Sequence, residues 1–204
     1  MKTRAGFTIV ELLIVVVVIA ILAVITIITY NGIQQQAYNT QVLSGVRSFV
    51  QVIESYKAVT GSYPQTTTEK NRERIGMACL GTGYEDEYCG VVTGADVYED
   101  PDLNDELKRV IGSGSAISTT MQELPLNRPE GDEYSAGAAY GIDHIGSGHA
   151  SVPGGGYARV LEYMIRGESG SCGVTGAEVW FTSSSPAVTG CIIIFESTPG
   201  YTPL

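Results

Sequence analysis

The chain has 204 residues, 44% of them hydrophobic, and this length suits one compact domain with an added segment. Its 12 Lys and Arg residues stand against 22 Asp and Glu residues, so the formal net charge is -10 at pH 7. A surface of this sign repels nucleic acid phosphates and argues against DNA binding by the bulk of the chain. The basic residues Lys70, Arg72 and Arg74 are interleaved with Glu69 and Glu73, a pattern typical of a solvated helix face.

The N-terminus combines a short basic leader with a long apolar run. Lys2 and Arg4 precede residues 7–28, about 22 residues that would span a hydrocarbon core of about 30 Å as a helix. The pattern predicts one membrane-spanning helix. By the positive-inside rule, the leader should stay in the cytoplasm and everything after Tyr30 should lie outside.

Glu11 distinguishes this run from simpler apolar segments. A conventional secretory signal has a shorter apolar region, about 7 to 15 residues, with a small-residue cleavage site after it. A plain anchor gives no reason for an acidic residue that costs about 2.5 to 3.5 kcal/mol inside a spanning helix. A core helix of a soluble protein is disfavoured by the all-round apolarity of the run. Because no Lys or Arg follows Glu11 before Arg47, the carboxylate needs a cation from elsewhere.

Helical periodicity continues through residues 31–60, where the polarity rises. Apolar residues recur three to four positions apart and form a single stripe that should pack on a sheet. The stripe consists of Ile33, Ala37, Val42, Val46, Phe49, Val50, Ile53 and Tyr56. Gly61 can adopt the left-handed cap and Pro64 cannot continue the helix, so the helix should end near Thr60.

Residues 61–127 show no regular pattern and are expected to form a variable linker, with a short helix near 103–111. Five acidic side chains lie close together in this region and could supply oxygen ligands to calcium. They are Asp96, Glu99, Asp100, Asp102 and Asp105. Their spacing matches no EF-hand loop, so a solvated acidic loop is the expected interpretation and a calcium site is the alternative.

Strand signals are clearest in residues 128–204. β-branched and aromatic residues at 157–165, 178–182 and 191–195 predict three antiparallel strands, which makes the fold α+β. The sequence contains none of the common hydrolase, metalloprotease or P-loop motifs, and His144 and His149 lie in a glycine-serine stretch. The residues therefore predict neither an enzyme nor a bound cofactor.

The four cysteines are Cys79, Cys89, Cys172 and Cys191, and they lack the C-x-x-C pairs of zinc and redox sites. Structural disulfides fit them better, in an oxidising compartment outside the membrane. Three pairings are possible. The local one joins Cys79 to Cys89 and Cys172 to Cys191.

Residues 6–13, Gly-Phe-Thr-Ile-Val-Glu-Leu-Leu, resemble the G-F-T-[LI]-[VI]-E-L-[LM] processing motif of the type IV prepilin family. In that family a membrane aspartyl peptidase cuts after the glycine and methylates the new phenylalanine amine, and the glutamate assists assembly. The resemblance implies cleavage between Gly6 and Phe7, methylation of Phe7 and an assembly role for Glu11. Residues 56–64 also resemble the Y-x4-G-x-Y-P stretch that follows the helix in many pilins and pseudopilins.

The resemblance implies a domain organisation. Residues 1–6 would be a cleaved leader, 7–30 the transmembrane and filament-core helix, and 31–60 the amphipathic helix of the head. Residues 61–127 would be the variable linker, and 128–204 an antiparallel β-sheet head whose 172–191 interval resembles the disulfide-bounded region of pilins.

The resemblance also implies a function, that of a structural subunit of a type IV pilus serving adhesion, twitching motility or DNA uptake. A pseudopilin of a type II secretion or competence system is the alternative, and a membrane-anchored enzyme would need a catalytic constellation. The implied partners are copies of the chain, other pilins, prepilin peptidase, a membrane platform protein, an assembly ATPase and, before assembly, the lipid bilayer. The implied location is the inner membrane, then an extracellular pilus or transenvelope pseudopilus.

Overall fold

The computed structural model describes residues 8–71, 76–81, 87–92, 95–111, 138–146, 152–184, 187–199 and 201. The elements in chain order are α1 (Ile9–Thr60), α2 (Thr67–Lys70), β1 (Gly76–Cys79), β2 (Tyr88–Val92), β3 (Ala95–Tyr98), α3 (Pro101–Ile111), β4 (Ala139–Ile145), β5 (Gly156–Arg166), β6 (Ala177–Ser184) and β7 (Ala187–Ser197). The chain divides into a first unit, Met1–Ala37, and a second unit, Tyr38–Leu204, and α1 contributes to both.

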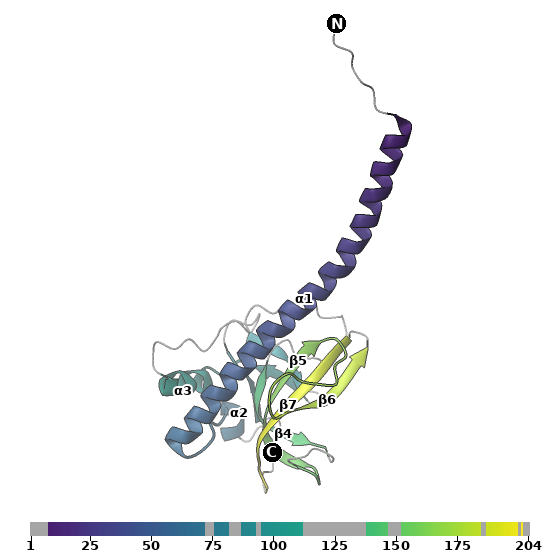
Figure 1. Cartoon of the computed structure of the whole chain (residues 1–204). Coiled ribbons are helices and arrows are strands. Elements are labelled where there is room, and N and C mark those ends of the chain that lie inside the picture. The colour runs from purple at the N-terminus through teal and green to yellow at the C-terminus, as the bar shows by residue number, and fades with distance from the viewer. Residues whose placement is uncertain are drawn as a thin grey trace. The chain divides into compact units, whose positions relative to one another are not determined.

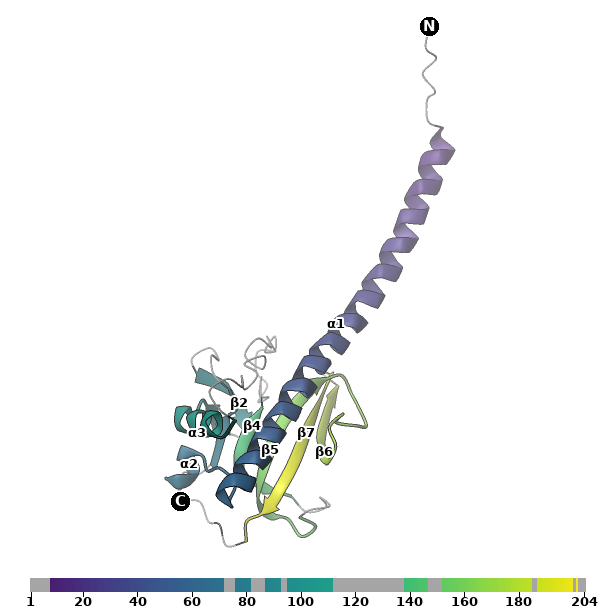
Figure 2. The same ribbon diagram turned by 60° about the vertical axis from the view of Figure 1, so that its left-hand side comes forward.

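The second unit is built on a five-stranded antiparallel sheet with the strand order β1-β4-β5-β7-β6. The long strand β5 lies at its centre, paired with β4 on one side and β7 on the other. The part of α1 that belongs to this unit lies across one face of the sheet (Figures 1 and 2). Strands β2 and β3 form a separate two-stranded ribbon. The predicted α+β class is confirmed.

The core between α1 and the sheet follows from the two periodicities of the sequence. On α1, Val46, Phe49 and Ile53 are fully buried at helical spacing. On β5, Leu161 and Tyr163 alternate toward the same core. The predicted apolar stripe is therefore confirmed in its later part, whereas Ile33 and Ala37 in the first unit are exposed.

Helix α1 ends where the sequence predicts. Gly61 has φ 85°, a left-handed conformation that costs a residue with a Cβ more than glycine. Its N–H donates to the carbonyl of Lys57 at 2.8 Å, which satisfies one of the last orphan carbonyls of the helix. The short helix expected near 103–111 is α3.

The three C-terminal strands are confirmed as β5, β6 and β7, but four further strands, β1 to β4, were not predicted. Strand β4 contains Gly141, and a Cβ there would lie 1.8 Å from the carbonyl oxygen of Gly76 on β1. The two backbones thus approach too closely for any side chain at 141. Residues 61–127, expected as a variable linker, include β1, which adds an edge strand to the main sheet.

Candidate functional site

The start of α1 brings Thr8 and Glu11 together in a capping box. The backbone N–H of Thr8 donates to Glu11 Oε2 at 2.9 Å, and the Thr8 hydroxyl donates to the same oxygen at 2.7 Å. The N–H of Glu11 donates in return to the Thr8 hydroxyl oxygen at 3.3 Å. This reciprocal arrangement satisfies donors that a helix start leaves unpaired. The sequence already contains the Thr-x-x-Glu signal for it, which the sequence analysis missed.

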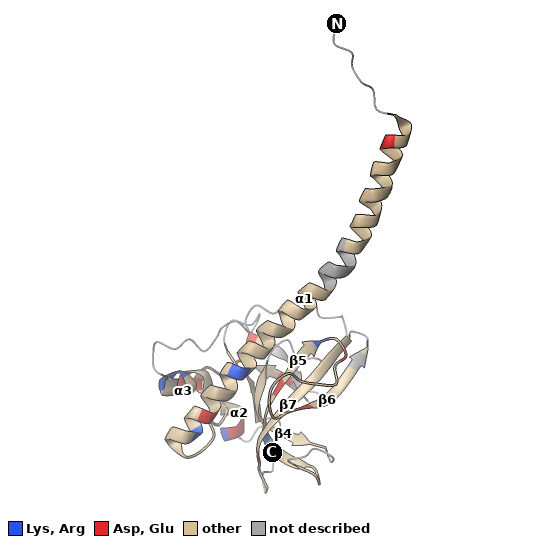
Figure 3. Cartoon of the chain, in the orientation of Figure 1, with Lys and Arg blue, Asp and Glu red and all other residues tan. Residues whose placement is uncertain are grey.

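The helix that follows presents apolar side chains in every direction. Fourteen large apolar residues between Ile9 and Ile25 are between 47% and 85% exposed. They are Ile9, Val10, Leu12, Leu13, Ile14, Val15, Val16, Val17, Val18, Ile19, Ile21, Leu22, Val24 and Ile25. Glu11 is the only charged residue of α1 before Arg47 (Figure 3). A helix that is apolar on all sides is normally buried, either against other apolar protein surfaces or in lipid.

The area of this apolar surface determines how much free energy would be gained by burying it. Complete burial of these fourteen side chains would gain roughly 20 to 40 kcal/mol, an upper bound on the hydrophobic scale. Exposed apolar surface of this extent marks a protein or membrane interaction site. Among the described residues, no helix reaches the length and apolarity that a membrane crossing requires.

The predicted processing residues fall partly outside the described part of the chain. Gly6 and Phe7 lie outside the described residues, so the structure does not test cleavage or methylation. Glu11 is described and stands exposed in the first turn of α1. Its assembly role remains a prediction from the resemblance, now joined by a local role in capping α1.

Within the second unit, α1 is fastened to the sheet by polar contacts that the sequence did not reveal. The Asn39 side chain donates to the Arg166 carbonyl at 2.9 Å and accepts from the Arg166 N–H at 2.8 Å. The Arg166 guanidinium lies 4.1 Å from the centre of the Tyr38 ring. Burial raises the pKa of Tyr38 to about 12, although the Arg166 charge acts in the opposite direction. Arg166 lies more than a hundred positions from Tyr38 and Asn39, so no local sequence pattern predicts these contacts.

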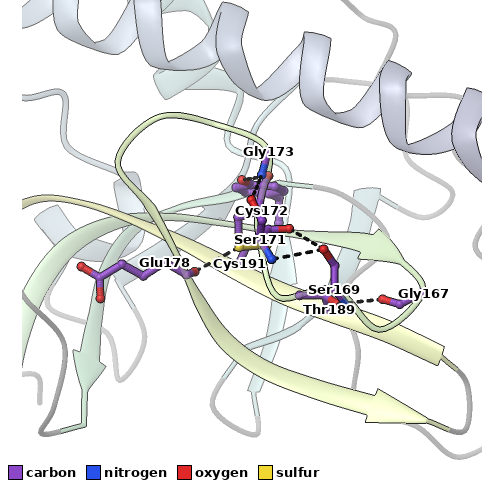
Figure 4. The surroundings of a disulfide bond; sticks show 9 residues. Gly167, Ser169, Ser171, Cys172, Gly173, Glu178, Thr189 and Cys191 are labelled. Carbon is purple, nitrogen blue, oxygen red and sulfur yellow. Dashed lines mark hydrogen bonds between the residues drawn. A yellow bond between two sulfur atoms is a disulfide. The ribbon is translucent and has the colours of Figure 1, made fainter.

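The disulfide between Cys172 and Cys191 ties the loop before β6 to β7 (Figure 4). The Tyr163 hydroxyl donates to the Cys172 carbonyl at 2.8 Å. Arg47 on α1 donates from Nη2 to the Gly173 carbonyl at 2.7 Å. The loop is thereby held against both the sheet and α1.

The predicted pairing of Cys172 with Cys191 is confirmed. Cys79 is also disulfide-bonded, and no free cysteine occurs in the described part of the chain. The side chain of Cys89 lies outside the described residues, so the pairing of Cys79 with Cys89 stays a prediction.

Replacing both Cys172 and Cys191 with serine is expected to lower the free energy of unfolding by about 3 kcal/mol, because the bond closes a loop of 19 residues. Urea unfolding of the full chain in detergent, followed by tryptophan fluorescence, measures the change. Exchanging the exposed Ser55 for alanine is the matched control and should leave the midpoint in place. A double-serine chain that unfolds at the wild-type urea concentration contradicts the expectation.

Two of the five acidic residues considered for calcium, Asp100 and Asp105, have other contacts in the structure. Asp100 Oδ1 accepts from the Leu103 N–H and from the Thr67 hydroxyl, each at 3.0 Å, so this carboxylate caps α3. Asp105 pairs with Lys108 at 3.3 Å. In the described ranges, no group of three or more potential metal-ligating side chains is found. The structure gives the calcium interpretation no support.

Two further sequence interpretations can be compared with the structure. Glu69 is not on a solvated face, because it is buried and paired with Arg159. Lys70 is exposed and pairs with Glu106 at 3.3 Å, whereas Arg72, Glu73 and Arg74 lie outside the described residues. His144 is exposed, and its ring centre lies 5.2 Å from that of Tyr157. His149 also lies outside the described residues.

The family model described as the prokaryotic N-terminal methylation motif matches residues 1–27. The chain carries the signature of the type IV pilins and pseudopilins. The signature covers Gly6, Phe7 and Glu11, and it extends over most of the exposed apolar part of α1. No curated protein and no solved structure matches the chain. The pilin signature therefore rests on the N-terminus, and the second unit has no matched relative.

Proposed function

We propose that the chain is a structural subunit of a type IV pilus, processed by prepilin peptidase and polymerised through its N-terminal helix. One observation carries the proposal. Immediately after the motif's cleavage point, α1 exposes apolar side chains on all sides and has a single carboxylate in its first turn. Such a helix supports packing against copies of itself, and it offers no catalytic group.

Processing supplies the cation that Glu11 lacks. Hydrolysis of the bond between Gly6 and Phe7 would create a new amine at Phe7, which the peptidase then methylates. In a bundle of apolar helices, where the effective dielectric constant is about 20 rather than 80, an ammonium and a carboxylate attract each other strongly. The Phe7 amine of an incoming subunit would pair with Glu11 of a subunit already in place and set the axial stagger.

Before assembly, residues 7–30 would hold the precursor in the inner membrane, with the second unit on the outer side. The disulfide between Cys172 and Cys191 fits that side, because such bonds persist in oxidising compartments. A membrane platform protein and an assembly ATPase would then move subunits from the bilayer into the filament.

A pseudopilin of a type II secretion or competence system is the second candidate, because it shares the methylation motif and the exposed helix. Sheared surface filaments distinguish the two. A pilus subunit should be their bulk component, whereas a pseudopilin should be absent from them at normal expression.

The mature chain is expected to begin at methylated Phe7, and mass spectrometry of its N-terminal peptide tests this. Gly6→Val should block cleavage, because a β-branched side chain replaces a residue with none. Ala5→Val is the matched control and should still be cleaved. A mature chain that starts elsewhere contradicts the processing step.

A further inference from the structure

The disulfide between Cys172 and Cys191 lies in the core between α1 and the sheet. Cys172 is 2% exposed and Cys191 is 1% exposed. Both belong to the cluster that also contains the buried apolar residues of α1. Disulfides form and break when a thiolate attacks one of the sulfurs, so the rate depends on whether a reagent can reach them. In the folded chain, the surroundings must therefore move before an oxidant or a reductant can approach.

The strands close one side of the bond. Cys191 lies inside the sheet, where it is paired with Tyr163 on β5 and with Val179 on β6. Cys172 lies in the loop between β5 and β6, and its Sγ is 3.2 Å from the Glu178 carbonyl oxygen (Figure 4). The paired strands leave a reagent no path to the sulfurs through the sheet.

Helix α1 closes the other side, because it is attached to the chain on both sides of the buried cysteine of the loop. Before it, the Asn39 side chain exchanges two hydrogen bonds with the backbone of Arg166. After it, Arg47 donates to the Gly173 carbonyl at 2.7 Å. Gly173 has φ 67°, and a Cβ there would lie 2.8 Å from Leu43 Cδ1, so the loop and the helix are in close contact. Separation of α1 from the loop is the movement that would uncover the bond.

The same cover would keep an oxidant from two free thiols at these positions. Burial in apolar surroundings also disfavours the thiolate, which is the reacting form of cysteine. We propose that Cys172 and Cys191 are joined before α1 packs on the sheet, and that packed α1 then protects the bond from exchange. This order would hold for a pilus subunit and for a pseudopilin alike, because it concerns the second unit by itself.

The oxidant would be a disulfide in the compartment outside the membrane. The thiolate of one cysteine attacks a sulfur of that disulfide, which forms a mixed disulfide and releases one thiolate of the oxidant. The thiolate of the other cysteine then attacks the sulfur of the first, which forms the bond between Cys172 and Cys191 and releases the second thiolate. The chain loses two electrons and two thiol protons, and the oxidant is reduced to its two thiols.

Breaking the bond passes through a mixed disulfide in the same way, so the rate of reduction measures the same access. The full chain in detergent is treated with dithiothreitol, samples are alkylated, and the peptides that contain Cys172 and Cys191 are counted by mass spectrometry. Wild type should be reduced at least about a hundredfold more slowly in buffer than in urea, because a reagent reaches the bond only when the structure opens. Equal rates would overturn the proposal.

Two asparagines with the same kind of contact separate the opening of α1 from global unfolding. Asn39→Ala removes both hydrogen bonds between α1 and Arg166, and reduction should become faster by about tenfold or more. Asn104 on α3 makes the same pair of hydrogen bonds with the backbone of Gly81, at 2.8 and 3.1 Å. Asn104→Ala is therefore the matched control, which should weaken the fold similarly without uncovering the bond. If the two variants are reduced at equal rates, α1 is not the cover and the proposal fails.

Oxidation of the wild-type chain tests the order directly and does not depend on whether a variant folds. Chains reduced in urea are diluted into detergent buffer, and oxidised glutathione is added either at dilution or after refolding. Added at dilution, it should join Cys172 to Cys191 in nearly all chains. Added after refolding, it should form the bond at least about tenfold more slowly, since α1 must first open. A bond that forms equally fast in both cases would overturn the proposed order.

Discussion

Replacing Glu11 with alanine is expected to remove nearly all filaments while leaving a precursor that is still cleaved after Gly6. The carboxylate would no longer meet the Phe7 amine of the next subunit, so the apolar helices would lose the contact that sets their stagger. Filament yield is measured by shearing cells and comparing the sheared fraction with the membrane fraction by immunoblot. A wild-type yield from Glu11→Ala contradicts the ion-pair role.

The capping box makes a sharper design possible, because Glu11 has a local role as well. Glu11→Gln keeps a residue that suits the third position of a capping box but removes the charge. Thr8→Val removes the hydroxyl contacts and keeps the charge. If the ion pair matters, the glutamine chain should fail to assemble and the valine chain should succeed. The reverse result would assign the role of Glu11 to helix capping.

Replacing Arg159 with methionine is expected to lower the free energy of unfolding by about 3 to 5 kcal/mol, because it leaves the buried Glu69 carboxylate without its cation. Arg159 is 4% exposed and donates from Nη1 to Glu69 Oε2 at 2.7 Å and to the Pro64 carbonyl at 3.0 Å. The Tyr140 hydroxyl donates to the same carbonyl at 3.0 Å. This cluster holds the chain that leaves α1 against the sheet.

Urea unfolding of the full chain measures the loss. The double change Arg159→Met with Glu69→Leu should recover a large part of it, since removing both charges leaves neither one buried alone. Arg159→Lys should have a free energy of unfolding between those of wild type and Arg159→Met, because an ammonium keeps the charge but cannot reproduce the bidentate contact with the carboxylate. A loss below about 1 kcal/mol for Arg159→Met would show that water or another group replaces the guanidinium.

The parts of the fold that the sequence predicted depend on local chemistry. The amphipathic stripe on α1, its end before Gly61 and the strands β5 to β7 all follow from residues within a few positions of one another. The same holds for Gly6, Phe7 and Glu11, which all lie within residues 1–27, the stretch that matches the methylation motif. The capping box was equally readable, because Thr8 and Glu11 are three residues apart.

Strand β4 and the roles of Glu69 and Asp100 could not be predicted in this way. Strand β4 includes Ala139, Gly141 and Asp143, residue types that are depleted in strands, so it gives a weak strand signal, and its place beside β5 follows from sheet pairing. Glu69 resembled a solvated residue because its partner Arg159 is 90 positions away. Asp100 resembled a metal ligand because its role as the cap of α3 became visible only with the helix boundaries.

The sequence by itself determined that the N-terminus carries the pilin signature and that an amphipathic helix packs on an antiparallel sheet. Both are properties of short stretches, fixed by hydrophobic period and by a few spaced residues. Only the tertiary structure decided which polar groups become buried partners. Asn39 with Arg166 and Glu69 with Arg159 meet because the tertiary fold packs helices α1 and α2 against strand β5, far away in the sequence, and burial strengthens these polar contacts.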